Sequence, residues 1–279
     1  MNHQTEAIHI HRISNGRKEW LPDMLAIEEP LEIQLQYSSD TGMMKKSIAV
    51  TMRTPGNDEE LAAGFLFTEG IISGHGDIER INRHSTDQNK ILVILVENVK
   101  PRLPQAARNF YTTSSCGVCG KASIEAVQVN IPQRTKNELR VTETMLYALP
   151  SLLREHQEAF EHTGGIHASA LFDVVGNLIS LREDVGRHNA LDKLLGSCLL
   201  KNDLPLDQHL LLLSGRASFE LIQKAAVAGI QVVAAVGAPS SLAVDMAKEH
   251  DITMVGFLKP GRFNVYTGIE RIITESGFV

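Results

Sequence analysis

Cysteine is scarce in this sequence, with three residues in a chain of 279. Three cysteines are too few for the disulfide framework that stabilises small secreted domains, so the fold must depend on a hydrophobic core. The first twenty residues, MNHQTEAIHIHRISNGRKEW, lack the apolar stretch and the small-residue cleavage site of a secretory signal peptide. We therefore expect a cytoplasmic protein, in which thiols stay reduced.

Long apolar runs and an excess of positive charge are also missing. No stretch approaches the roughly 20 apolar residues that a membrane-spanning helix needs, so we expect no membrane partner. The formal net charge of -6 gives no bulk positive field, which argues against nucleic acid as a partner. Any binding site for an anion must therefore be built locally from a few cationic side chains.

The hydrophobic pattern divides the chain into an extension and two larger parts. Residues 1–27 are polar and typical of a solvated edge strand, and residues 28–140 predict a smaller α+β part that contains a C-x-x-C sequence. In residues 141–279, the apolar strands HLLLLSG, QVVAAVG and ITMVGFL alternate with helical segments. Short loops between strand and helix predict a parallel sheet covered on both faces. We therefore expect an α/β fold, α+β overall.

Local signals in the first half predict particular elements. The segments LEIQLQY and SIAVTM alternate apolar and polar residues, which indicates a hairpin. A helix should begin at NDEELAAGFLF, with Asn57 as its cap and Glu60 completing a capping box. A second helical pattern covers residues 142–160, with Pro150 at a break or in a first turn.

Three loops that leave the predicted C-terminal strands suggest an anion site. The loop SGRASFE contains Arg216, VGAPSS follows the next strand, and FLKPGR contains Lys259 and Arg262. Ligands of open α/β sheets bind outside the carboxyl ends of the strands, and helix N-termini with arginines suit phosphate. The alternative is that these glycines, prolines and serines only form turns. The sequence has no G-x-G-x-x-G, and SSCGVCGKAS departs from a phosphate-binding P-loop.

The segment REDVGRHNALDK is dense in ionisable residues at a strand-to-helix junction. Arg187 and His188 are candidates for ligand contacts there, while the alternative is an ion-pair cluster at the start of a helix. His167, in GGIHAS, is a further candidate, although a lone histidine at a strand start is commonly an interior residue. Cys198 lies on an apolar helical stripe and should fill the core.

The remaining two cysteines, Cys116 and Cys119, form a C-x-x-C with a glycine after each. Structural zinc needs four ligands, and a deaminase-type zinc site needs H-x-E before P-C-x-x-C; neither pattern is present. We therefore expect no protein-bound metal. The preceding YTTSS is not the buried strand of a thioredoxin-like motif. Nucleophilic sulfur remains, and the thiol chemistry alone leaves sulfur relay and plain redox exchange both open.

Seven motifs in fixed order, LAAGFLFTEGII, SSCGVCGKAS, GGIHASAL, EDVGRHNALDKLLG, SGRASFELIQKA, SSLAVDMA and GFLKPGRFNVYTG, resemble the FdhD family of sulfur carrier proteins for formate dehydrogenase. The resemblance covers roughly residues 28 to 268, and several long motifs together are far more specific than any one. Ile166 stands where the family pattern leads us to expect threonine before the histidine.

The resemblance implies a sulfurtransferase. Such proteins take persulfide sulfur from a cysteine desulfurase and pass it to the molybdenum or tungsten cofactor bis(molybdopterin guanine dinucleotide), or bis-MGD, for formate dehydrogenase. Cys116 matches the persulfide-carrying cysteine and Cys119 its helper. The cofactor-binding segment matches Phe257, Leu258, Lys259, Pro260, Gly261 and Arg262. The resemblance also implies a cytidine deaminase-like domain without the zinc site, and a homodimer.

The positions of His167, Arg187, His188 and Arg216 near predicted strand ends suggest that they add to this cofactor site. Two other functions stay open at this point. One is a non-catalytic chaperone that binds the cofactor without carrying sulfur. The other is a zinc hydrolase of the deaminase type, which would contain stoichiometric zinc.

Overall fold

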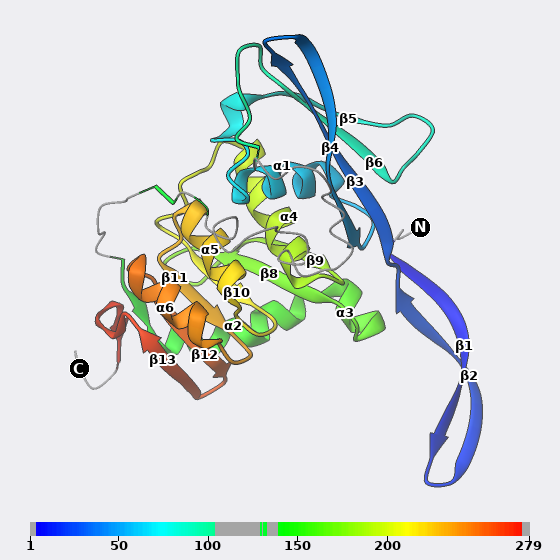
Figure 1. The fold of residues 1–279 in the computed structure, drawn as a ribbon. Coiled ribbons are helices and arrows are strands. Elements are labelled where there is room, and N and C mark those ends of the chain that lie inside the picture. Colours follow the sequence, from blue (N-terminus) through cyan, green and yellow to red (C-terminus); the bar gives the residue numbers. More distant parts are fainter. Residues whose placement is uncertain (1–3, 104–128, 130, 133–138, 275–279) are drawn as a thin grey trace.

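A computed structural model describes residues 4–103, 129, 131–132 and 139–274 of the chain. Cys116 and Cys119 lie outside the described residues. The described chain contains a central six-stranded sheet flanked by helices, a four-stranded sheet beyond these helices, and a hairpin that projects from the body (Figure 1). No helix in the described ranges is both long and apolar enough to cross a membrane.

The central sheet is mixed, with the strand order β13-β12-β11-β10-β8-β9. Its strands are β8 (His167–Phe172), β9 (Leu178–Asp184), β10 (Leu210–Leu213), β11 (Val232–Ala235), β12 (Thr253–Lys259) and β13 (Arg262–Thr267). Strands β10, β11 and β12 run parallel, and their neighbours β8 and β13 are antiparallel to them. The predicted α/β class is confirmed. The parallel pairing predicted for the three apolar strands is confirmed for β10, β11 and β12. The segment HASALFDVVGNLISL, whose Gly176-Asn177 predicts a hairpin, forms β8–β9, and a tight turn also joins β12 to β13, so both of these pairs are antiparallel.

Both faces of this sheet are covered, as predicted. Helices α4 (Arg187–Leu200), α5 (Phe219–Ala228) and α6 (Ser241–Glu249) pack on one face, and α2 (Glu143–Glu155) packs on the other. In β10, Leu211 and Leu213 join the core under α4 and α5, while Leu210 and Leu212 face α2. A short parallel pair, β7 (Val141–Thr142) and β14 (Ile272–Ile273), borders α2, and a 3-10 turn (Ile269–Arg271) precedes β14.

The N-terminal part forms a second sheet of order β4-β3-β6-β5. Its elements are β3 (Glu29–Ser39), β4 (Gly42–Arg53), α1 (Asp58–Thr68), a 3-10 turn (His75–Asp77), β5 (Ile78–Arg83) and β6 (Lys90–Leu95). The predicted hairpin is β3–β4. Helix α1 lies between this sheet and α4, so the apolar residues of both parts form one continuous core. The domain boundaries at residues 27 and 140 stay predictions.

The crossing of α1 and α4 is unusually close because a glycine from each helix lies at the contact. A Cβ atom at Gly64 would overlap the carbonyl oxygen of Asp192, and a Cβ at Gly196 would overlap that of Glu60. Glu60 also accepts a 2.7 Å hydrogen bond from the guanidinium of Arg182. Backbone contact and a half-buried ion pair therefore fix the two parts of the chain together.

Two expectations about the helices are wrong. Asn57 does precede α1, but its backbone is left-handed (φ 57°) and its side chain makes no capping hydrogen bond. Glu60 cannot complete a capping box because it pairs with Arg182. Pro150 lies inside α2 rather than at a break or in a first turn.

Residues 5–26 form a hairpin of their own, β1 (Thr5–Ser14) and β2 (Arg17–Ala26). This two-stranded sheet touches helix α3 (Glu158–Thr163) and otherwise extends away from the body (Figure 1). The prediction of a solvated edge strand is confirmed for β1, but the pairing with β2 was not predicted. Asn15-Gly16 at the turn is the sequence signal for it, since this dipeptide favours two-residue hairpin turns.

Candidate functional site

The candidate site lies at the carboxyl ends of the parallel strands, where backbone hydrogen bonds hold three loops together. The loop after β10 and the loop after β11 are joined by Gly237 N–H to Gly215 C=O (3.0 Å) and by Ala217 N–H to Ala238 C=O (3.1 Å). The N–H of Phe257, in β12, donates to Gly237 C=O (3.0 Å). All three loops therefore present their residues at one edge of the sheet.

Glycines let side chains approach these loops closely. A Cβ atom at Gly215 would lie 3.2 Å from Nδ1 of His167, which reaches this edge because β8 runs antiparallel to β10. A Cβ at Gly237 would lie 2.9 Å from the backbone nitrogen of Arg216. Neither position has room for a larger residue without movement of the neighbouring loop.

His167, Arg187, His188 and Arg216, which the sequence placed on separate segments, come together here. The pKa of the half-buried His167 lies below its ordinary value, first because burial disfavours the imidazolium and then because Arg187, His188 and Arg216 are close by. His167 is therefore neutral at pH 7 and can donate or accept a hydrogen bond. Arg187 and His188 belong to the first turn of α4, directly after β9.

The two arginines of this cluster have no carboxylate partner among the described residues. Arg187 Nε is buried and makes no hydrogen bond, and neither Arg187 nor Arg216 forms an ion pair in the described ranges. An unpaired guanidinium nitrogen away from water is costly unless a ligand satisfies it. The arrangement is therefore suited to an anion, and arginine matches phosphate and carboxylate oxygens well.

Among the described residues, the acidic side chain of Glu220 contacts the cluster, and no sequence motif assigns it a role. Its Oε2 lies 2.9 Å from Nε2 of His188, which is also 3.3 Å from Ser218 Oγ. Its Oε1 is buried without a hydrogen-bond partner. Glu220 lies in the first turn of α5, within the same SGRASFE loop as Arg216, so proximity in sequence was the available signal.

The segment Phe257–Arg262 divides into parts with different surroundings. Phe257 has a left-handed backbone (φ 52°) and is 43% exposed near the end of β12. Strain of this kind is concentrated at functional positions. Leu258 instead packs into the core that faces α2, so its side chain does not reach the site. Lys259, Pro260, Gly261 and Arg262 form the exposed turn to β13.

The ion-pair alternative for REDVGRHNALDK is also partly realised. Lys193 Nζ lies 2.7 Å from Asp184 Oδ2, with both side chains fully buried, and Lys224 lies 3.0 Å from Asp192. Burial raises the pKa of both aspartates, and the adjacent lysines act in the opposite direction. These four residues stabilise the packing of α4, whereas Arg187 and His188 face the site.

Cys116 and Cys119 lie outside the described residues, and within those residues no group of three or more metal-ligating side chains occurs. Cys198 is 5% exposed in the core, and burial raises the pKa of its thiol. The sequence-based expectation that Cys198 fills the core is confirmed.

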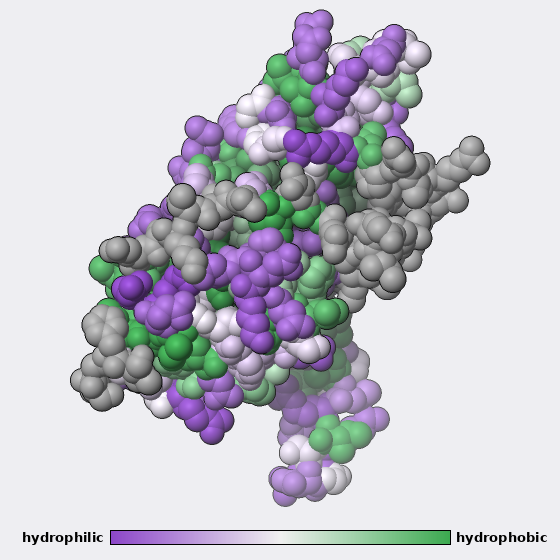
Figure 2. Space-filling view, turned by 60° about the vertical axis from the view of Figure 1, so that its left-hand side comes forward, coloured by the Kyte–Doolittle hydropathy of each residue, from purple (hydrophilic) through white to green (hydrophobic). Residues whose placement is uncertain are grey.

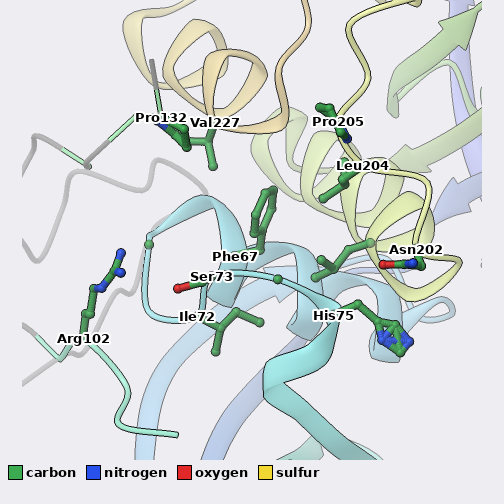
Figure 3. A pocket seen from close by; sticks show the side chains of 13 residues that line it. Phe67, Ile72, Ser73, His75, Arg102, Pro132, Asn202, Leu204, Pro205 and Val227 are labelled. Atoms are coloured by element: carbon green, nitrogen blue, oxygen red, sulfur yellow. The ribbon is translucent and has the colours of Figure 1, made fainter. Parts of the chain in front are cut away.

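A separate hollow of about 430 Å³ lies at the other end of α4. Phe67 stands at its centre, with Arg102 and His75 on opposite sides (Figure 3). Helix α4 has 14 residues, so this hollow is roughly 20 Å from the His188 end of the helix. It does not belong to the arginine cluster.

Comparison with known proteins identifies the chain. The family model described as the FdhD/NarQ family matches residues 26–273. The chain belongs to the FdhD/NarQ family. Among curated FdhD proteins, "Sulfur carrier protein FdhD" of Streptomyces coelicolor is 48% identical, covering 98% of this chain and 97% of its own. The protein of the same name from Mycobacterium tuberculosis is 44% identical, over 98% of this chain and all of its own.

A solved structure is also similar in fold. It is described as a putative formate dehydrogenase accessory protein from Desulfotalea psychrophila. The TM-score is 0.76 at 26% identity, and the match covers 97% of this chain and 100% of the other. The similarity therefore extends over the whole architecture described above.

Proposed function

We propose that this protein is a sulfur carrier that accepts persulfide sulfur from a cysteine desulfurase on Cys116, with Cys119 as helper, and transfers it to bis-MGD for formate dehydrogenase. The names of the curated relatives support sulfur carriage, and the name of the structural neighbour supports the connection with formate dehydrogenase. Within the described part of the chain, the observation that carries the proposal is that Arg187 and Arg216, beside His167, have no carboxylate partner there, and that Arg187 Nε makes no hydrogen bond.

The substrate suits this cluster because each guanine dinucleotide half carries a diphosphate. Arg187 Nε is a buried donor without a partner among the described residues, and Arg216 adds a second, exposed guanidinium. Neutral His167 can supply one further hydrogen bond. The bare backbone at Gly215 and Gly237 lets an extended ligand approach the loops closely. The exposed ring of Phe257 offers a flat apolar surface against which a base can stack.

The sulfur step is a thiol exchange that needs no external oxidant. The thiolate of Cys116 attacks the terminal sulfur of the desulfurase persulfide, so one S–S bond breaks in the donor while another forms on Cys116. The desulfurase cysteine leaves as a thiolate. If Cys119 then attacks Cys116 at the sulfur bound to carbon, hydrosulfide is released and a Cys116–Cys119 disulfide remains. A cellular dithiol reductant returns that disulfide to two thiols.

Intact-mass spectrometry tests the carrier role. The protein is incubated with cysteine desulfurase and cysteine, without reductant. We expect a gain of one sulfur atom that is lost on adding a thiol reductant and is absent in Cys116→Ala. Cys198→Ala is the matched control and should keep the gain, because its thiol is buried with a raised pKa.

The same experiment separates the carrier from a cofactor chaperone. A wild-type protein that binds guanosine diphosphate but never gains sulfur would contradict the carrier proposal. So would a Cys116→Ser, Cys119→Ser double variant that still activates formate dehydrogenase fully. In either case the arginine cluster would serve a chaperone that holds the cofactor without sulfurating it.

A further inference from the structure

The start of α4 is fixed by residues that belong to the N-terminal part of the chain. Gly186 is the N-cap residue of α4, and glycine has no side chain that could accept a hydrogen bond from the first turn. Hydrophilic residues cover much of the face shown in Figure 2, as is usual for a protein surface. Thr54, in the loop between β4 and α1, is by contrast 0% exposed. A fully buried polar side chain needs hydrogen-bond partners, and Thr54 has them at the start of α4.

Thr54 makes hydrogen bonds through its side chain and through both of its backbone groups. Its hydroxyl oxygen accepts a 3.1 Å hydrogen bond from the backbone N–H of Val185, two residues before Arg187. Its backbone N–H donates to Asp184 Oδ2 (3.2 Å), and its carbonyl accepts from Lys193 Nζ (2.8 Å). The two backbone bonds need no particular side chain, so the hydroxyl bond to Val185 is the one that depends on threonine at this position.

Asn189, in the first turn of α4, adds a second set of bonds across the same junction. Its Oδ1 accepts a 3.1 Å hydrogen bond from the hydroxyl of Thr51. Its Nδ2 donates to the carbonyl of Met52 (2.7 Å) and to Asp184 Oδ1 (3.3 Å). The backbone N–H of Gly186 also donates to Asp184 Oδ1 (2.8 Å). A buried polar network whose groups have partners is rigid and specifies one arrangement of the segments that it joins.

Arg187 is the reason why a rigid start of α4 matters. It is the first residue of the helix, and its buried Nε has no hydrogen-bond partner in the described part of the chain. In the absence of a ligand, such a nitrogen favours any rearrangement of the turn that returns it to water. Fixed positions of Val185 and Gly186, directly before Arg187, oppose that rearrangement. A binding group that is already held in place costs less free energy to order when the ligand binds.

We propose that Thr54 is a positioning residue for the arginine cluster, because its hydroxyl holds Val185 and thereby keeps Arg187 in the arrangement that binds a diphosphate. This inference rests on the proposed function, in which the ligand is a guanine dinucleotide. Thr54 acts through Val185 and makes no contact with the ligand itself. Without the hydroxyl, a smaller fraction of the protein has the binding arrangement, and the apparent Kd rises in proportion. The N-terminal part therefore contributes to the affinity of a site whose ligand contacts lie in the C-terminal part.

Isothermal titration calorimetry with guanosine diphosphate tests the proposal, on the full-length protein and at a temperature where every variant is folded. Thr54→Val keeps nearly the same shape and removes the hydroxyl, so the Kd should rise about threefold to tenfold, the effect of one lost hydrogen bond. Thr54→Ser keeps the hydroxyl, so its Kd should stay within about twofold of wild type. In the ligand-free proteins, hydrogen exchange at the amide of Val185 should be faster in Thr54→Val than in wild type.

Thr68→Val is the matched control for a general loss of stability. Thr68 is also buried between the two parts, at 1% exposure, and its hydroxyl donates a 2.7 Å hydrogen bond to Asp192, beyond the first turn of α4. Thr68→Val should lower Tm at least as much as Thr54→Val does, because it also removes a buried hydrogen bond. Its Kd for guanosine diphosphate and its exchange at Val185 should stay close to the wild-type values.

An unchanged Kd in Thr54→Val, or an equal rise in Thr68→Val or Thr54→Ser, would overturn the positioning role and leave the proposed function standing. If the wild type does not bind guanosine diphosphate, both the positioning role and the cofactor part of the proposed function are refuted. Sulfur gain on Cys116 is measured in parallel by intact mass. If the three variants behave as expected but the wild type gains no sulfur, only the carrier role is refuted.

Discussion

Replacing Arg187 with methionine should stabilise the ligand-free protein and weaken ligand binding at the same time. Arg187 Nε is buried without a hydrogen-bond partner in the described part of the chain, so the folded protein bears the cost of removing it from water. Methionine keeps most of the aliphatic contact and removes the polar nitrogen. Arg187 therefore destabilises the ligand-free fold, whereas hydrogen bonds from its guanidinium stabilise the complex with a bound diphosphate.

The expected changes in Tm and in affinity follow from the hydrogen bonds that Arg187 lacks in the ligand-free protein and makes to a bound phosphate. An unsatisfied buried polar group costs about 1–3 kcal/mol, and we take about 1 kcal/mol because Arg187 as a whole is half-buried. For a chain of this size that raises Tm by roughly 2–4 °C. A hydrogen bond to a charged group contributes about 1.5–3 kcal/mol, so affinity for guanosine diphosphate should fall at least about tenfold. At 100 times the wild-type Kd, ligand stabilisation then falls from about 2.7 to about 1.4 kcal/mol.

Thermal unfolding with and without guanosine diphosphate measures both effects on one sample. Arg80→Met is the control, since Arg80 is exposed in β5, far from the site, and should change neither quantity. A ligand-free Arg187→Met protein that unfolds at lower temperature would show that Arg187 has a structural partner. Unchanged ligand stabilisation would remove Arg187 from the binding site.

Three further changes test the packing and the electrostatics. Gly196→Ala should cost about 3 kcal/mol or more in urea unfolding, because the added Cβ overlaps the carbonyl of Glu60 and forces α1 and α4 apart. Lys193→Met leaves Asp184 buried without its lysine, which should cost about 3–5 kcal/mol in the same assay. His167 has a lowered pKa in the folded state, so the unfolded chain binds more protons below about pH 6.5. The free energy of unfolding should therefore decrease as the pH is lowered through that range. The decrease between about pH 8 and about pH 5 should be smaller in His167→Gln than in the wild type.

Matched substitutions accompany these variants. Gly74→Ala adds a methyl group where nothing lies within 4 Å, and Lys201→Met removes an exposed lysine just after α4. Both should stay within about 0.5 kcal/mol of wild type. A Gly196→Ala protein as stable as the Gly74→Ala control would contradict the close crossing. An equal pH response of wild type and His167→Gln would contradict the lowered pKa.

Much of the architecture could be predicted from the sequence because its signals are local. The alternation in LEIQLQY and SIAVTM defines β3 and β4, and the apolar run HLLLLSG becomes β10 with leucines buried on both faces. The loops of Arg216, Lys259 and Arg262 follow the ends of β10 and β12 as expected. The binding roles of these residues stay predictions.

Other contacts in the fold and at the site could not be predicted, because they join segments that are distant in the sequence. Glu220 meets His188 only because α4 and α5 pack side by side, and no periodicity in either helix indicates that pair. Glu60 could complete a capping box on local rules, but Arg182 lies close enough in the fold to bind it. The β8–β9 hairpin at one margin of the sheet could be predicted from Gly176-Asn177, whereas the antiparallel β13 at the other margin could not, because Lys259–Arg262 has no such turn signal.

The close crossing of α1 and α4 also has a consequence for synthesis of the chain. The hydroxyl of Thr68 in α1 donates a hydrogen bond to Asp192 in α4, 124 residues later in the sequence. The apolar residues of α1 that pack against α4 therefore have no packing partner until α4 has been synthesised. At a synthesis rate of about 5–20 residues/s this interval lasts roughly 10 s. During that time the apolar side of α1 is exposed on the nascent chain. The N-terminal half should therefore be a substrate for ribosome-associated chaperones until the second half emerges.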